Sequence, residues 1–91
     1  MDVSNSTGQN TSYRVLGGGT GNQTGNELTG SLKPGQQESC PVADGKFWLR
    51  FFIDGAEVAC ATFHKAPEAV VLQEDEWGYR VQPANGKEVT F

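Results

Sequence analysis

Apolar and polar positions alternate most clearly in the segment KFWLRFFIDGAEVACATF, residues 46–63. Two alternating runs flank Asp54-Gly55, and an Asp-Gly pair between such runs is a strong signal of a two-residue hairpin turn. Because the strand repeat is two residues, pairing outward from this turn defines one face of the predicted hairpin. That face carries Phe47, Leu49, Phe51 and Ile53 opposite Thr62, Cys60, Val58 and Ala56. It is almost wholly apolar, so the sequence predicts that it lies in the core.

The opposite face of the same predicted hairpin is unusually aromatic. It carries Trp48, Arg50 and Phe52 from the first strand and Ala59, Ala61 and Phe63 from the second. A solvent-facing sheet surface usually carries polar residues at such positions. Three explanations remain open: the rest of the chain covers this face, a second copy or another protein binds it, or its rings form a platform for sugars.

Short strands separated by turn signals account for most of the remaining chain. SYRVL at residues 12–16 alternates as a strand does, Pro34-Gly35 is a type II turn pair, and Asn85-Gly86 indicates a last hairpin. No long window shows the apolar spacing of a helix. The sequence therefore predicts an all-β fold, a single small antiparallel β-sandwich or a small barrel, of six to seven short strands.

The first third of the chain is rich in Gly, Asn, Ser and Thr. Residues 1–11 are predicted to be disordered or loosely held, and residues 17–26 to form a flexible glycine-rich loop. A single β-sandwich domain is predicted over residues 12–91. The loop does not match a phosphate-binding loop, because Ser31 and Leu32 follow the glycines at positions that require Lys and then Ser or Thr.

Charge and hydropathy narrow the classes of partner. The 91 residues carry a net charge of −4, and the seven Lys and Arg residues are scattered singly, whereas a nucleic-acid site needs them clustered. No apolar run approaches the length of a membrane span, so membrane insertion is not expected. If Met1 is the native start, the chain is expected in the cytoplasm. If Met1 was added to a mature secreted chain, an extracellular or periplasmic location is expected.

The two cysteines, Cys40 and Cys60, are too far apart for a CxxC redox or zinc motif. One interpretation is a disulfide, which would close a loop with nineteen residues between the cysteines. In the chain-entropy model such a bond stabilises the fold by roughly 3 kcal/mol. The other interpretation is two buried thiols that pack as small hydrophobic groups.

No group of residues matches a catalytic or metal-binding motif. His64 is the single histidine, and the sequence gives it neither an orienting carboxylate nor a nucleophile. The acidic run Glu74-Asp75-Glu76 lacks the spacing of a calcium loop. We therefore expect no enzyme activity, no cofactor and no metal.

The remaining hypothesis is a small acidic binding or assembly protein without catalysis. It would act through the aromatic face that includes Trp48, Arg50, Phe52 and Phe63, by self-association or by binding another protein, which it could inhibit. The alternative is a carbohydrate-binding module that uses Trp48, Trp77 and Tyr79.

Overall fold

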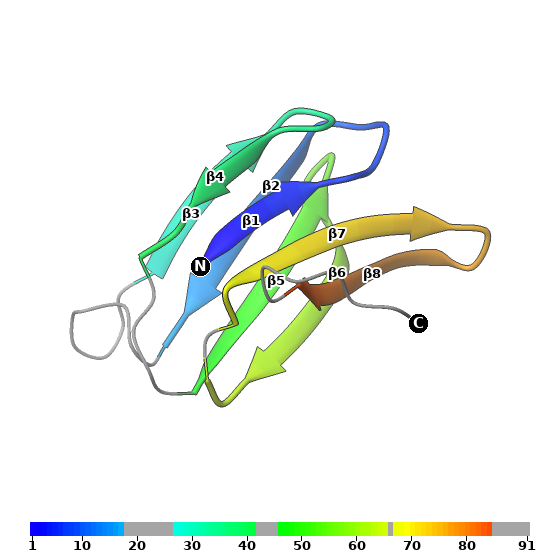
Figure 1. The fold of residues 1–91 in the computed structure, drawn as a ribbon. Helices are drawn as coiled ribbons and strands as arrows, with labels where there is room; N and C mark the ends of the chain where they lie inside the picture. The colour runs from blue at the N-terminus through cyan, green and yellow to red at the C-terminus, as the bar shows by residue number, and fades with distance from the viewer. Residues whose placement is uncertain (18–26, 42–45, 66, 85–91) are drawn as a thin grey trace.

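The computed structural model describes residues 1–17, 27–41, 46–65 and 67–84, and within these ranges the chain forms eight strands and no helix (Figure 1). The strands are β1 (Asp2–Asn5), β2 (Thr11–Leu16), β3 (Glu27–Leu32), β4 (Gln37–Ser39), β5 (Phe47–Ile53), β6 (Ala56–Phe63), β7 (Ala69–Asp75) and β8 (Gly78–Ala84). The all-β prediction is confirmed. The predicted hairpin at Asn85-Gly86 and most of the glycine-rich loop lie outside the described residues.

The strands form two four-stranded sheets that pack as a sandwich. Sheet A has the order β4-β1-β7-β8, and sheet B has the order β3-β2-β5-β6. All neighbouring strands are antiparallel except β1 and β7, which are parallel. The parallel pair departs from the purely antiparallel prediction. After β6 in sheet B, the chain crosses back to sheet A. There β7 runs in the same direction as β1.

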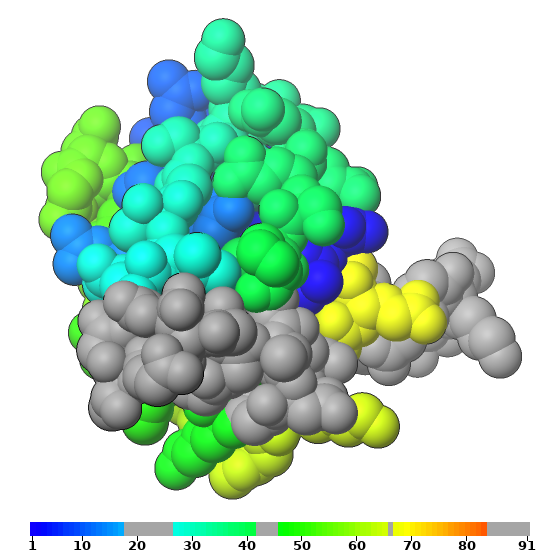
Figure 2. Space-filling model, turned by 90° about the vertical axis from the view of Figure 1, so that its left-hand side faces the viewer, coloured from blue at the N-terminus to red at the C-terminus, as the bar shows by residue number. Residues whose placement is uncertain are grey.

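The N-terminal segment is an integral strand, and the prediction that residues 1–11 are loosely held is wrong. Strand β1 lies between β4 and β7, and the space-filling view shows its dark-blue atoms between green β4 and yellow β7 (Figure 2). Val3 is fully buried, and the Cys40 N–H donates to the Met1 carbonyl at 2.7 Å. The segment contains too few apolar residues for a strand signal. Its order comes from backbone hydrogen bonds to distant segments.

A buried asparagine holds the connection from β1 to β2. The Asn5 Nδ2 group donates to the Gln9 carbonyl at 2.7 Å and to the Leu32 carbonyl at 3.1 Å. Its Oδ1 atom accepts hydrogen bonds from the Thr7 N–H at 2.9 Å and from the Thr7 hydroxyl at 2.7 Å. All the hydrogen-bonding groups of this buried amide are therefore used, and they join β1 to β3.

The core lies between the two sheets, on the inner faces of the strands. Its buried members are Val3, Tyr13, Val15, Leu32, Cys40, Phe47, Leu49, Phe51, Val70 and Leu72. Of the apolar residues of β5 that the hairpin pattern assigned to the core, Phe47, Leu49 and Phe51 are fully buried and Ile53 is 8% exposed, which confirms that part of the prediction. Each large apolar side chain contributes about 1.5–3 kcal/mol when it is fully buried.

A β-bulge changes the predicted register of the β5–β6 hairpin. Ile53 pairs with Ala56 and Phe52 with Glu57 as predicted, but the register then shifts, so that Phe51 pairs with Ala59 and Phe47 with Phe63. Since a shift of one residue reverses the face on which every later side chain lies, β6 places Phe63 in contact with the core. The Phe63 and Phe47 rings are stacked with centroids 5.3 Å apart.

The same bulge separates the two cysteines. Cys40 is buried, whereas Cys60 is exposed on the outer side of β6, and both are free thiols. The disulfide considered from the sequence is therefore not formed, and only Cys40 matches the alternative of a buried thiol. The placement of Cys60 in the core was wrong, because the sequence pattern contains no sign of the extra residue in β6.

The β7–β8 hairpin extends beyond its sheet. The last residue of β1, Asn5, pairs with Leu72, so the distal parts of β7 and β8 pair only with each other. Figure 1 shows this hairpin projecting past the other strands. Its turn carries Trp77, whose surface is 84% exposed.

Candidate functional site

The outer face of sheet B gathers positive and aromatic side chains on its two central strands. We call it the cation–aromatic face and define it by Arg14 on β2, Lys46 immediately before β5, and Trp48, Arg50 and Phe52 on β5. The three β5 residues alternate with buried Phe47, Leu49 and Phe51. Successive side chains of a strand point to opposite faces of the sheet, so burial of the three phenylalanine and leucine side chains places Trp48, Arg50 and Phe52 on the outer face.

Cations lie over both aromatic rings of this face. The Arg14 guanidinium carbon lies 5.3 Å from the Phe52 ring centroid, and Lys46 Nζ lies 5.5 Å from the Trp48 ring centroid. Such contacts contribute roughly 0.5–1 kcal/mol at exposed sites. Each of these two rings thus has a cation over its face, which favours the positions of Arg14 and Lys46 seen in the structure.

Arg14 and Arg50 occupy directly opposite positions on β2 and β5. Like charges at such positions destabilise a sheet. Glu27 lies 3.9 Å from Arg14, and Glu57 lies 3.5 Å from Arg50, both longer than a strong charge-assisted hydrogen bond. The two arginine side chains remain 56% and 44% exposed, so their guanidinium groups are accessible to a further anion.

Trp48 has a large exposed aromatic surface, 39% of the residue. The described residues form the two sheets of the sandwich and place no third layer over sheet B. The ring packs over Gly17, which has a φ of 91°, and a Cβ atom at Gly17 would lie only 3.2 Å from the ring. A side chain there would both strain the backbone and displace the indole.

Phe63 does not belong to this face, contrary to the sequence prediction. It lies on the inner side of β6 because of the bulge, and Phe47 contacts it there. Its place beside Trp48 is taken by Thr62, the cross-strand partner of Trp48. The predicted binding set therefore reduces to Trp48, Arg50 and Phe52. Arg14 joins them from β2, which the hairpin pattern alone did not indicate.

The structure does not bring Trp48, Trp77 and Tyr79 together as a sugar platform. The Tyr79 hydroxyl accepts a hydrogen bond from Gln9 Nε2 at 3.0 Å, beside the start of β2. Trp48 pairs with Leu16 at the other end of β2, in the opposite sheet from Tyr79. A strand of that length spans roughly 17 Å. One ligand ring cannot stack on all three side chains.

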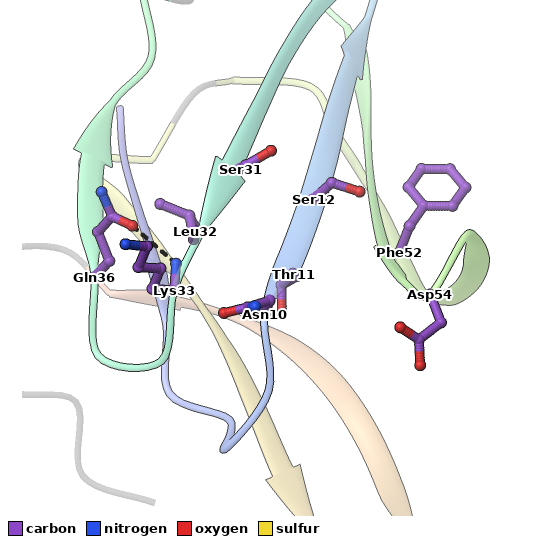
Figure 3. Close-up of a pocket in the computed structure, with 9 residues that line it drawn as sticks. All are labelled: Asn10, Thr11, Ser12, Ser31, Leu32, Lys33, Gln36, Phe52 and Asp54. Carbon is purple, nitrogen blue, oxygen red and sulfur yellow. Dashed lines mark hydrogen bonds between the residues drawn. The ribbon is translucent and has the colours of Figure 1, made fainter.

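A pocket adjoins the cation–aromatic face at the end where β2 begins (Figure 3). The cavity volume is about 560 Å³, within the usual range for small-ligand sites. Ser31, Ser12 and Phe52 form one cross-strand row along it. Its lining residues are Asn10, Thr11, Ser12, Ser31, Leu32, Lys33, Gln36, Phe52 and Asp54. Sequence analysis missed this pocket, since turns that are distant in sequence meet there.

The pocket is polar, with one aromatic ring at its side. The Lys33 N–H donates to Gln36 Oε1 at 2.8 Å, which fixes the turn that carries both residues. Neither Lys33 nor Asp54 forms an ion pair with any residue in the described ranges. Hydroxyl, amide, ammonium and carboxylate groups therefore line a space that could accept a small molecule with several hydroxyl groups.

The described part of the chain contains no group of three or more side chains that could hold a metal ion. His64 is exposed just after β6 and is not among the residues that line the pocket. Within the same residues, no helix is long and apolar enough to span a membrane.

Comparison of the chain with family models, with curated proteins and with solved structures gave no match. The class of protein is therefore described from its fold and its surface. It is a small β-sandwich with an accessible cation–aromatic face on one sheet and a polar pocket beside it.

Proposed function

We propose that this protein is a non-catalytic binding protein whose cation–aromatic face binds a protein surface that carries carboxylates. The observation that supports this proposal most directly is the opposition of Arg14 and Arg50 beside exposed Trp48. A carboxylate held between the two guanidinium groups would relieve their repulsion. Trp and Arg are also the residue types most enriched among residues that dominate binding energy.

The dimensions of the face favour a protein over a small ligand. Trp48 and Phe52 are four residues apart on one strand, a separation of roughly 14 Å. Arg14 extends the face onto the neighbouring strand, and Glu27 and Glu57 lie at its margins. An aromatic and arginine centre with a charged margin is typical of protein interfaces.

The test is affinity capture from an extract of the source cells with immobilised wild-type protein, Trp48→Ala and Arg50→Glu. Lys65→Glu is the matched control, because it makes the same charge change at an exposed residue outside the face. We expect wild type and Lys65→Glu to retain a protein that both face variants lose while remaining folded. Identical capture by all four proteins would contradict the proposal.

A second candidate function is supported by the pocket. Sugars stack a C–H face on an aromatic ring and use their hydroxyls as hydrogen-bond donors and acceptors, and Phe52 with Ser12 and Ser31 offers both. This carbohydrate hypothesis uses Phe52 in place of Trp48, Trp77 and Tyr79. Its test is a ¹⁵N NMR titration with a glycan panel. Shifts confined to the pocket amides would support it, and an unchanged spectrum would exclude it for those glycans.

A further inference from the structure

We infer that the tip of the β7–β8 hairpin, residues 74–77, of a second copy occupies the cation–aromatic face, so that copies of this chain associate head to tail. This inference rests on the proposed function, because it assigns the occupant of the same face. It is drawn from the shape, exposure and charge of the hairpin tip.

The tip is a projecting and well-ordered turn. The Trp77 N–H donates to Asp75 Oδ1 at 2.8 Å, and Arg80 pairs with the other oxygen of Asp75, Oδ2, at 2.8 Å. These contacts fix the turn while Trp77 remains 84% exposed. The turn thus fixes the backbone of Trp77, and a tryptophan side chain has only two rotatable χ angles to immobilise on binding, which suits it as an anchor.

The free charges of the tip are opposite to those of the face. Asp75 is neutralised by Arg80, but Glu74 and Glu76 are exposed and form no ion pair with any residue that the structure describes. The face presents two loosely paired guanidinium groups and the Lys46 ammonium beside aromatic rings. A tip with two exposed carboxylates that form no ion pair within the described residues, and with one indole, therefore complements the face in both charge and apolar surface.

The contact must form between copies. The hairpin belongs to sheet A, whereas the cation–aromatic face lies on the outer side of sheet B and points away from sheet A. A tip cannot reach the face of its own chain. Because tip and face are different surfaces, each copy can use both at once. A reciprocal contact between two copies then gives a two-fold dimer, and a non-reciprocal contact gives an open chain or a closed ring.

The contact is small, since a hairpin tip with one large anchor lies at the low end of interface areas, below about 1,200 Å². We therefore expect association at hundreds of micromolar protein. Sedimentation equilibrium of the wild type at these concentrations should give an average mass that rises above the 9.8 kDa monomer as concentration increases. A constant monomer mass would overturn the inference.

Two complementary variants test the head-to-tail geometry. Arg50→Glu should prevent binding through the face while leaving the tip intact. Trp77→Ala should prevent binding through the tip while leaving the face intact. Each alone should remain monomeric. An equimolar mixture should form a dimer of twice the 9.8 kDa monomer mass and grow no further, because one tip and one face remain between the two variants. Lys65→Glu should associate as the wild type does.

A mixture that stays monomeric, or a single variant that still associates, would overturn the inference. If Arg50→Glu fails to fold by circular dichroism, Arg14→Glu replaces it as the face variant. If copies of the chain do not associate, the proposed function can still be tested by the affinity capture described above. A protein that is captured by the wild type and lost by Trp48→Ala would be a different occupant of the same face.

Discussion

The Tyr13 hydroxyl on β2 donates a hydrogen bond to the Glu38 carboxylate on β4, and this bond joins sheet B to sheet A. Gly30, the β3 partner of Tyr13, leaves the space in which the two side chains meet. The aromatic ring is buried and its polar end is satisfied, as a core tyrosine requires. We derive two predictions about stability from this contact between Tyr13, Glu38 and Gly30.

Stability should fall at alkaline pH because of Tyr13. Burial, and secondly the hydrogen bond to Glu38, raise the pKa of Tyr13 well above its ordinary value of 10.0. A group whose pKa is raised in the folded state stabilises that state fully below its unfolded pKa, and this stabilisation is lost as pH rises above it. Urea unfolding should therefore show a free energy that declines above about pH 10. Tyr13→Phe should reduce that decline, and equal slopes for the two proteins would contradict the assignment.

Gly30→Ala should break the contact between the sheets. A Cβ atom at Gly30 would lie 2.5 Å from the Tyr13 hydroxyl oxygen and would also collide with the Glu38 carboxylate. Overpacking of this kind costs about 1–3 kcal/mol of unfolding free energy. Gly8→Ala is the matched control, because nothing lies within 4 Å of a Cβ atom there. Similar denaturation midpoints for the two variants would show that the space at Gly30 is not needed.

Asn5→Ala should be more destabilising than its short polar side chain suggests. It would remove the side-chain partner of the Leu32 carbonyl and of the Thr7 N–H, and the Gln9 carbonyl would keep only its hydrogen bonds from the Thr7 and Thr11 hydroxyls. We expect a loss of about 2–3 kcal/mol in unfolding free energy. The exposed Asn10 offers a control, and Asn10→Ala should change the unfolding free energy by less than about 0.5 kcal/mol. Thermal or urea denaturation measures both, and equal effects would contradict the role given to Asn5.

The two thiols should react at very different rates. Cys60 is exposed, whereas Cys40 is buried and its pKa is raised by that burial, so Cys40 has little thiolate at neutral pH. A thiol reagent should modify one cysteine rapidly in the native protein and the second only after unfolding. Mass spectrometry of the labelled peptides identifies each site. Slow labelling of Cys60 would contradict the register given by the bulge, and rapid labelling of Cys40 would contradict its burial.

Periodicity and turn residues predict the parts of this fold that depend on local interactions. The β5 pattern identified Phe47, Leu49 and Phe51 as core residues, and Asp54-Gly55 located the hairpin turn. Both signals arise within a few residues of chain. The outward alternation of Trp48, Arg50 and Phe52 was predictable for the same reason.

The features that the sequence missed depend on distant partners. Strand β1 contains one fully buried apolar residue, Val3, and owes its place to pairing with β4 and β7. The β6 bulge places Phe63 against Phe47 on the inner side of the sheet, and no turn signal in the sequence indicates this bulge. The pocket beside Phe52 requires the turns that carry Lys33 and Asp54 to meet, and strand order decides that.

The position of β1 also has a consequence for the order in which the chain folds. This strand is made before the other described strands, but its parallel partner β7 is made only after five further strands, since Val3 pairs with Val70. Sheet A therefore cannot assemble progressively during synthesis, whereas the β5–β6 hairpin can form as soon as its own residues emerge. Until β7 arrives, β1 has an unpaired edge on the side that β7 will cover. The interval between synthesis of the first and seventh strands is the period in which the nascent protein is most open to mispairing with another chain.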